Sequence, residues 1–212
     1  MKTKDQIDKL FDNLRTWIAF PKYQAERRLD VFFGLYLEDI LKACRNTEFA
    51  KEDKLVLIPE FPLQKNDKNK ECTNIDYLVF NVSKQSMHAI ELKTDNHSVD
   101  DDQIKYYCKF QGVEIKELFD FVINTNRKGR SKKKYTNLAE YIQNYNLDKY
   151  KWHKERKVIY LLPEESQKIK EAGFESITFK EIAEKMKPYA SEDELLSAFL
   201  GFIRGINEYQ NT

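Results

Sequence analysis

The spacing of apolar side chains changes along the chain and divides its first half into two kinds of segment. Near the N-terminus, apolar residues recur every three or four positions, which predicts amphipathic helices over about 4–18 and 24–44. Short runs rich in Ile, Val, Phe and Tyr follow, and they predict strands at Leu55–Pro59, Ile75–Val82 and Met87–Thr94. The first half of the chain therefore reads as two helices followed by three strands.

The second half alternates between the two patterns. Helices are predicted around Ile104–Cys108, near 113–124, near 135–146 and over 164–172, with strands at Lys157–Leu162 and Phe174–Thr178. Two capping-box spacings, Thr178 with Glu181 and Ser191 with Glu194, predict where the last two helices begin.

The order of these elements predicts an α/β fold. The segment between the second and third strands is too short for a crossover helix, so these strands should form an antiparallel hairpin. Both faces of Ile75–Phe80 are mostly apolar, which is typical of a strand covered on both sides. We therefore expect a mixed central β-sheet flanked by α-helices on both faces.

Composition narrows the class of protein. The chain has 212 residues, which is suited to one domain, and its net charge of +1 provides no overall attraction to nucleic acid or membrane. No apolar run approaches the ~18 residues of a membrane span, and the charged N-terminus does not resemble a secretory signal. Three widely spaced cysteines favour a reduced chain without a disulfide frame. We expect a cytoplasmic protein that does not bind membranes.

Several common site types are excluded by the residues that they require. None of the six glycines has the spacing of a phosphate-binding Walker loop or of a Rossmann Gly-x-Gly-x-x-Gly. The Gly-x-Ser-x-Gly elbow of serine hydrolases is absent, and the three histidines lack metal-ligand spacing. The chemistry must therefore be carried by other side chains.

Two carboxylates and a lysine on the predicted hairpin form the strongest candidate site. Glu91 and Lys93 are two residues apart on one strand, so they share a face. In one register Asp76 lies opposite Glu91, and in a second, shifted by two residues, it lies opposite Lys93. In both registers the two carboxylates are roughly 5–8 Å apart, which suits a hard cation with the Leu92 carbonyl as a third ligand.

This arrangement resembles the PD-(D/E)XK phosphodiesterase superfamily, whose core runs helix–strand–strand–strand–helix–strand. Its first acid lies on the second strand and its Glu/Asp-x-Lys on the third; here these segments read Asn-Ile-Asp76 and Glu91-Leu-Lys93. Asn74-Ile75 stands where the name-giving proline would precede the aspartate. Gln103-Ile-Lys-Tyr-Tyr107 on the next predicted helix is similar to the Gln-x-x-x-Tyr motif of RecB-type nuclease domains. The resemblance covers about residues 24–162 of the single expected domain, 1–212, and leaves 163–212 as a C-terminal α/β extension.

The resemblance implies a role for each matching residue. Asp76 and Glu91 would bind Mg²⁺, with Mn²⁺ as an alternative, and Lys93 would activate or steer the attacking water. Gln103 and Tyr107 would position Lys93 or the nucleic acid. Another Glu would add to the metal shell, and two candidates remain open: Glu26, near the start of the predicted helix 24–44, and Glu60, on the first strand.

A cluster of basic side chains provides the candidate contact with phosphates. Six of the eight residues over 127–134 are basic, and the run has no apolar anchor, which predicts an exposed, mobile loop. Such a loop can grip a nucleic-acid backbone without reading its sequence. The residues concerned are Arg127, Lys128, Arg130, Lys132, Lys133 and Lys134.

The function expected from these patterns is a Mg²⁺-dependent nuclease that hydrolyses phosphodiester bonds, with DNA as the favoured substrate and RNA as the alternative. Cutting both strands would require a homodimer. Two alternatives stay open: a catalytically silent nuclease-fold module that binds nucleic acid or assembles with proteins, and a structural α/β protein in which these residues form a surface ion-pair network.

Overall fold

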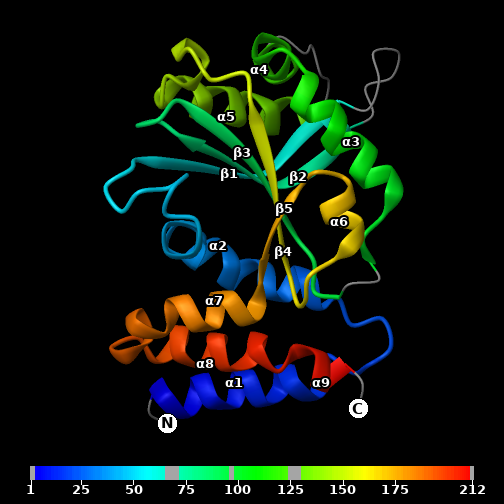
Figure 1. Ribbon diagram of the computed structural model, residues 1–212, viewed down its shortest axis with the longest axis vertical. Coiled ribbons are helices and arrows are strands. Elements are labelled where there is room, and N and C mark those ends of the chain that lie inside the picture. Colours follow the sequence, from blue (N-terminus) through cyan, green and yellow to red (C-terminus); the bar gives the residue numbers. More distant parts are fainter. Residues whose placement is uncertain (1–2, 65–71, 96–97, 124–129, 211–212) are drawn as a thin grey trace. The chain divides into compact units, whose positions relative to one another are not determined.

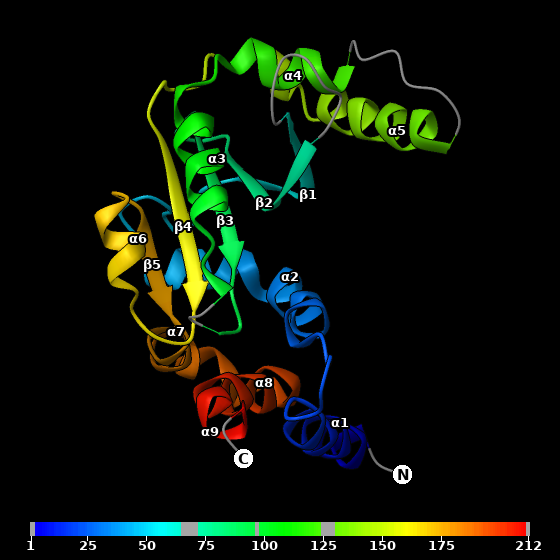
Figure 2. The same cartoon turned by 90° about the vertical axis from the view of Figure 1, so that its right-hand side faces the viewer.

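The chain folds as an α/β protein. The computed structural model describes residues 3–64, 72–95, 98–123 and 130–210. The described strands form one sheet in the order β1-β2-β3-β4-β5 (Figure 1). Strand β1 is antiparallel to β2 and β2 to β3, whereas the arrows of β3, β4 and β5 point the same way (Figure 2). The sheet is therefore mixed, as predicted, and helices flank it.

The elements follow the chain in nearly the predicted order. The strands are β1 (Leu55–Gln64), β2 (Cys72–Asn81), β3 (Ser86–Leu92), β4 (Arg156–Leu162) and β5 (Glu175–Thr178). The helices are α1 (Thr3–Trp17), α2 (Ala25–Cys44), α3 (Asp101–Gly112), α4 (Ile115–Ile123), α5 (Arg130–Asn144), α6 (Gln167–Glu171), α7 (Phe179–Met186), α8 (Glu194–Arg204) and α9 (Ile206–Gln210), with 3-10 turns η2 (Leu147–Lys149) and η3 (Lys187–Ser191).

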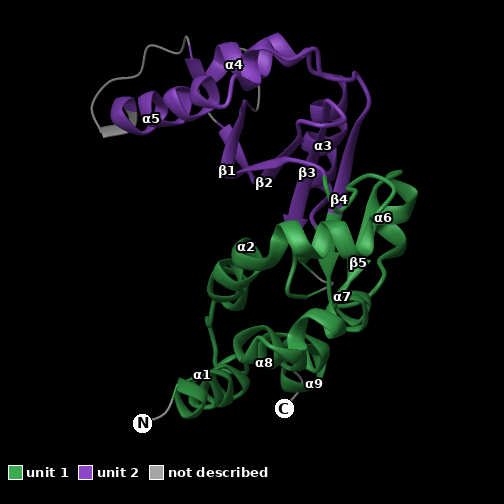
Figure 3. Ribbon diagram, turned by 90° about the vertical axis from the view of Figure 1, so that its left-hand side faces the viewer, with its two compact units in different colours: residues 1–52, 92–99, 160–212 green, residues 53–91, 100–159 purple. Residues whose placement is uncertain are grey.

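Contacts within the chain group it into two compact units (Figure 3). Unit 1 comprises residues 1–52, 92–99 and 160–212, and unit 2 comprises residues 53–91 and 100–159. The single-domain organisation stays a prediction.

The core of unit 1 is a layer of packed helices. Helix α8 packs against α1 and α7, and α7 packs against α2 (Figure 1). The ring of Phe33 lies at the centre of this layer, 5.1 Å from Phe199 in an edge-on arrangement and 5.3 Å from Phe179 between ring centroids. Such aromatic pairs add to the stabilisation from apolar burial, and they fix α2 by its inner face.

The core of unit 2 forms on the β1–β2–β3 meander. Helix α4 packs on β1 and on α5. Phe80 of β2 is fully buried, with its ring centroid 5.1 Å from that of Trp152 and 6.0 Å from that of Phe119. These large rings bury much apolar area per residue and therefore anchor the helical layer on the sheet.

Strand β1 is longer than the sequence predicts. It continues through Pro59 and Pro62 to Gln64, whereas the apolar pattern predicts its end at Pro59. Proline lacks an N–H and is tolerated chiefly on edge strands. Because β1 lies at the edge of the sheet, the two prolines do not interrupt it.

The prediction that 127–134 is a loop is wrong from residue 130 onward. Helix α5 begins at Arg130, so Lys132, Lys133 and Lys134 lie on its first turns. Farther along this helix, Ile142 is fully buried and provides an apolar anchor. Lysine and arginine are good helix formers, so the helix propagates back from the anchored part through the basic run.

The expected N-cap of α8 is also wrong. Asp193, not Ser191, caps this helix: its Oδ1 accepts a hydrogen bond of 2.9 Å from the Leu196 N–H. Ser191 ends η3, and its hydroxyl donates to the Pro188 carbonyl. The Ser191 hydroxyl is therefore bonded within η3 and does not cap α8. The other predicted cap is confirmed, because the Thr178 hydroxyl accepts from the Glu181 N–H at 3.1 Å.

None of the helices within the described ranges has both the length and the hydropathy required to cross a membrane.

Candidate functional site

The pairing of β2 with β3 decides between the two registers left open by the sequence. Tyr77 pairs with Ile90, and the same register continues to Asn81 and Ser86 at the turn. The paired residues end at Tyr77 and Ile90; continued by one residue, this register aligns Asp76 with Glu91, and it excludes the register shifted by two residues. Directly opposite residues on antiparallel strands project from the same face. The two carboxylates of the predicted site are therefore cross-strand neighbours in unit 2.

Glu91 is held by two side chains of α3. Only 1% of its surface is exposed. The Gln103 amide donates to its Oε1, and the Tyr107 hydroxyl donates to its Oε2. Gln103 and Tyr107 are one helical turn apart, so both face the strand. The sequence predicts that these two residues position Lys93 or nucleic acid, but the bonds described here go to Glu91.

Helix α3 includes the predicted helical segment Ile104–Cys108 and is fixed at both ends. At its start, Asp100 Oδ1 accepts from the Asp102 N–H at 2.8 Å. Near its end, Arg156 Nη1 donates to the Phe110 carbonyl at 2.6 Å, and the Gln111 amide donates to the Arg156 carbonyl at 3.0 Å. These bonds tie α3 to the first residue of β4 and thereby keep Gln103 and Tyr107 directed at Glu91.

Arg156 is a site-supporting residue that the sequence analysis missed. Only 4% of its surface is exposed. Burial lowers the pKa of its guanidinium, and the charge of Glu114 partly offsets this effect. The guanidinium also lies 5.5 Å from the centroid of the Phe110 ring, a cation–π distance. Its signal in the sequence was an arginine directly before a strongly apolar strand, and an arginine in that position is usually exposed to solvent.

Lys93 and Glu26 form an ion pair within unit 1. Their Nζ and Oε2 atoms are 3.7 Å apart, with the Lys93 side chain 8% exposed and that of Glu26 40% exposed. The backbone N–H of Lys93 donates to the Leu161 carbonyl at 2.8 Å, which fixes the chain directly after Glu91 and Leu92. Glu26 therefore contacts the lysine of the Glu-x-Lys motif.

Glu60, the rival candidate for the metal shell, lies in unit 2. The pairs Pro59–Tyr77 and Phe61–Ile75 flank it, so Glu60 falls beside Asp76 in the register of β1 and β2. Its backbone has a φ of 52°, a left-handed conformation that is uncommon for glutamate. The exposed carboxylate accepts a hydrogen bond of 2.6 Å from the Asn74 amide. Glu26 and Glu60 thus remain separate candidates, one in each unit.

The residues present can hold Mg²⁺ only if the ion keeps most of its water ligands. Within the described part of the chain, no group of three or more His, Cys, Asp or Glu side chains is arranged to hold a metal ion. Mg²⁺ commonly uses one or two carboxylates and keeps several waters. Each oxygen of a carboxylate has a second acceptor position, so Glu91 can keep its bonds from α3 and still bind a cation. Asp76 and Glu91 meet this minimum.

The candidate nucleic-acid residues are described only in part. Arg127 and Lys128 lie outside the described residues, and Arg130 is the first residue of α5. Lys132, Lys133 and Lys134 are exposed on the first turns of this helix in unit 2. They are accessible to phosphates in solution, and their side chains are arranged around the first turns of a helix rather than along a loop.

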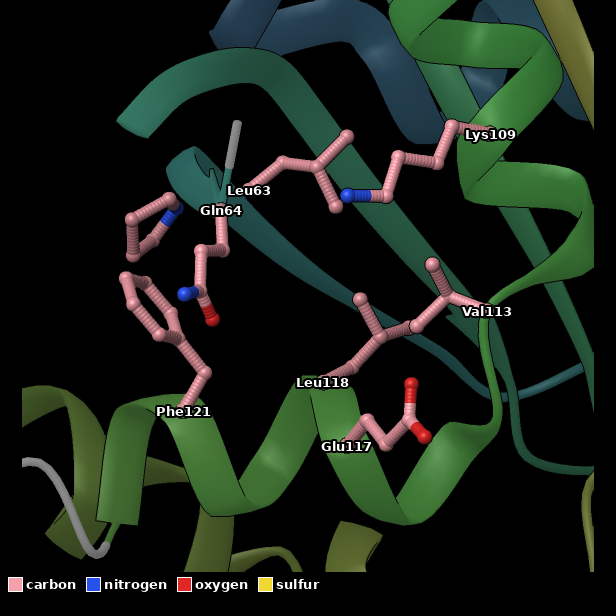
Figure 4. A pocket seen from close by; sticks show the side chains of 8 residues that line it. Leu63, Gln64, Lys109, Val113, Glu117, Leu118 and Phe121 are labelled. Carbon is pink, nitrogen blue, oxygen red and sulfur yellow. The ribbon is translucent and has the colours of Figure 1, made fainter. Parts of the chain in front are cut away.

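A small cavity in unit 2 does not serve as a substrate pocket. It lies between the end of β1, α3 and α4, and Figure 4 shows Lys109, Leu118 and Phe121 around it. Its volume is about 50 Å³. A single water requires ~10–15 Å³ of such accessible volume, so the cavity has space for a few waters and none for a nucleotide.

Comparisons of the chain with protein-family models, with curated proteins and with solved structures found no match.

Proposed function

We propose that the chain is a Mg²⁺-dependent nuclease of the PD-(D/E)XK superfamily that hydrolyses phosphodiester bonds, in DNA rather than RNA. The observation that carries the proposal is the register of β2 and β3, which ends at the pair Tyr77–Ile90; continued by one residue, it aligns the half-buried Asp76 with the buried Glu91. Burying a carboxylate is costly unless it accepts hydrogen bonds, and two ionised carboxylates on one face of a sheet repel each other. A bound cation would remove that repulsion.

The order of elements supports the same proposal. Helix α2 precedes β1, β2 and β3, and α3 and β4 follow later in the chain. The candidate acids lie on β2 and β3, and Gln103 and Tyr107 lie on α3. This order agrees with the restriction-endonuclease-like core that the resemblance implies, and it assigns the Gln-x-x-x-Tyr motif to the helix after Glu-x-Lys.

Each residue would have a distinct task in this proposal. Asp76, Glu91 and the Leu92 carbonyl would hold Mg²⁺, or Mn²⁺ as the alternative ion. Bound metal of this kind stabilises charge on the scissile phosphate and lowers the pKa of a bound water. Lys93, two residues after Glu91, would orient the attacking water and add positive charge near the phosphate. Gln103 and Tyr107 would keep the Glu91 carboxylate in one orientation.

The proposal is tested by conservative substitutions in a nuclease assay. Purified chain is incubated with linear, circular, single-stranded and branched DNA and with RNA, with and without Mg²⁺. We expect Asp76→Asn, Glu91→Gln and Lys93→Met each to reduce cleavage by at least ~100-fold, because each removes a metal ligand or the group that orients water. Asp102→Asn is the matched control, since this exposed carboxylate directly precedes Gln103 and pairs with Lys105. Robust cleavage by Asp76→Asn would refute the mechanism.

A second candidate is a catalytically silent module of the same fold. It is favoured by one observation: both Glu91 oxygens already accept bonds from α3, as a purely structural carboxylate would. Titration calorimetry with Mg²⁺ and Mn²⁺ on wild type and Glu91→Gln separates the candidates. Binding that depends on Glu91 without cleavage of any substrate would support the silent module. No binding would support an α/β protein in which these groups form an ion-pair network.

A further inference from the structure

The outer face of α2 has two large apolar side chains between opposite charges. Val31 is 71% exposed and Leu35 is 60% exposed, whereas Leu29 and Phe33 on the inner face are buried. One turn before Val31 lie two arginines, and one turn after Leu35 lie two acids. This face, which we call the α2 stripe, consists of one half-buried residue, Glu38, and five exposed ones: Arg27, Arg28, Val31, Leu35 and Asp39.

The spacing along the α2 stripe is that of a helix seam. Arg28, Val31, Leu35 and Glu38 are separated by three, four and three residues, the alternation of core positions in a coiled coil. The core of unit 1 does not require this pattern, because α2 packs on it with the opposite face. Single exposed aliphatic residues are common, but a seam-like spacing with charges at both ends indicates a second helix.

The charges on the stripe select the partner and its direction. In an antiparallel pair of α2 helices centred on Phe33, Val31 of each copy lies against Leu35 of the other. The same alignment brings Arg28 opposite Glu38 and Arg27 opposite Asp39, so each of these two arginines meets an acid. Glu38 Oε1 already pairs with Lys42 Nζ of its own helix at 2.7 Å, so Arg28 would bind the second oxygen of that carboxylate. A parallel pair would instead place each arginine against the same arginine of the second copy. The stripe is thus complementary to itself across a twofold axis, as an isologous interface requires.

We propose that the chain forms a homodimer through antiparallel packing of its α2 stripes. Gly34 lies beside the two apolar residues and is exposed, so the helices can approach closely at the centre. An open apolar groove adjoins the stripe at Arg28 and is lined by side chains that include Trp17, Phe20 and Phe32.

The size of the stripe sets the strength of the dimer. A single helix pair buries less than the ~1,600 Å² of a standard stable interface, and its ends are charged. The dimer should therefore be reversible and should weaken as salt screens the arginine–carboxylate pairs, over a Debye length of ~8 Å at physiological ionic strength. Association should be visible as a dependence of mass on protein concentration.

A charge-swap experiment on the full chain tests this assignment. Sedimentation equilibrium of wild type should show a mass that rises from 25.3 kDa towards that of a dimer as concentration increases. Variant R27E/R28E should remain a monomer because its stripe becomes wholly acidic, and E38K/D39K should remain one because its stripe becomes wholly basic. An equimolar mixture of the two variants should associate, because the acidic stripe of one then meets the basic stripe of the other.

The controls distinguish a lost interface from a lost fold. Circular dichroism should be unchanged in all variants, since the substituted side chains are exposed or, at Glu38, half-buried. E38K also removes the ion pair of Glu38 with Lys42, but an i,i+4 pair on a helix surface contributes little to stability. Val31→Lys with Leu35→Lys should abolish association alone and in mixtures with wild type. A wild type that stays monomeric at the highest concentration would overturn the proposal, as would charge variants that still associate with themselves. The mass readout needs no DNA or metal, so it is independent of the proposed nuclease activity.

Discussion

The hydroxyl of Tyr107 provides the most direct test of how the candidate site is held together. Tyr107 is 2% exposed, and its hydroxyl donates to Glu91, which is 1% exposed. Tyr107→Phe removes one oxygen and keeps the ring, so no large cavity forms. A hydrogen bond to a charged group contributes ~1.5–3 kcal/mol to stability. We expect the free energy of unfolding to fall by about this amount.

The measurement is urea unfolding followed by circular dichroism, with the slope against urea unchanged. Tyr189→Phe is the matched control, because this side chain is 53% exposed. Its effect should stay within ~0.5 kcal/mol. Equal losses for the two variants would refute the reasoning, since the buried bond would then contribute no more than an exposed one.

A double-mutant cycle assigns the loss to the proposed pair. Glu91→Gln removes the charge but keeps the shape, so Tyr107→Phe should cost less in that background because a bond to a neutral acceptor contributes less. We expect an interaction energy of at least ~0.5 kcal/mol, the lower range for residues in contact. An interaction energy of zero would mean that Tyr107 stabilises the protein through other neighbours.

Two further predictions concern the features that the structure corrected. Replacing Lys132, Lys133 and Lys134 with Ala should weaken DNA binding about equally for unrelated sequences, and it should flatten the slope of log K against log salt by ~0.9 per lost phosphate contact, as measured by fluorescence anisotropy. Thermal stability should be unchanged, because Ala is the better helix former. An unchanged salt slope would mean that DNA binds to another surface. Asp193→Ala should cost at least ~0.5–2 kcal/mol in urea unfolding, because it removes the N-cap of α8 and also the acceptor of the Tyr36 hydroxyl. Ser191→Ala should stay near zero, and the reverse order would contradict the observed cap.

Local pattern alone determined much of the fold. The period of apolar residues located α2 within one residue of its observed start, because the buried face of an amphipathic helix repeats along the sequence. The short link after Asn81 determined the antiparallel hairpin, because no crossover helix fits there. The Thr178 cap was readable for the same reason: its donor lies three residues away. Each of these features depends on neighbours in sequence.

Features that depend on distant parts of the chain were decided only by the tertiary structure. The register of β2 against β3 was one of two consistent with the sequence, since a slip by two residues preserves the faces of every side chain. The bonds from Gln103 and Tyr107 to Glu91 depend on where α3 lies against β3, and that position is anchored by Arg156, more than forty residues farther along the chain. The basic run became helical because Ile142 is buried downstream of it. Tertiary packing decides these features because they depend on contacts between segments that are far apart in the sequence, and a local sequence pattern contains no information about such contacts.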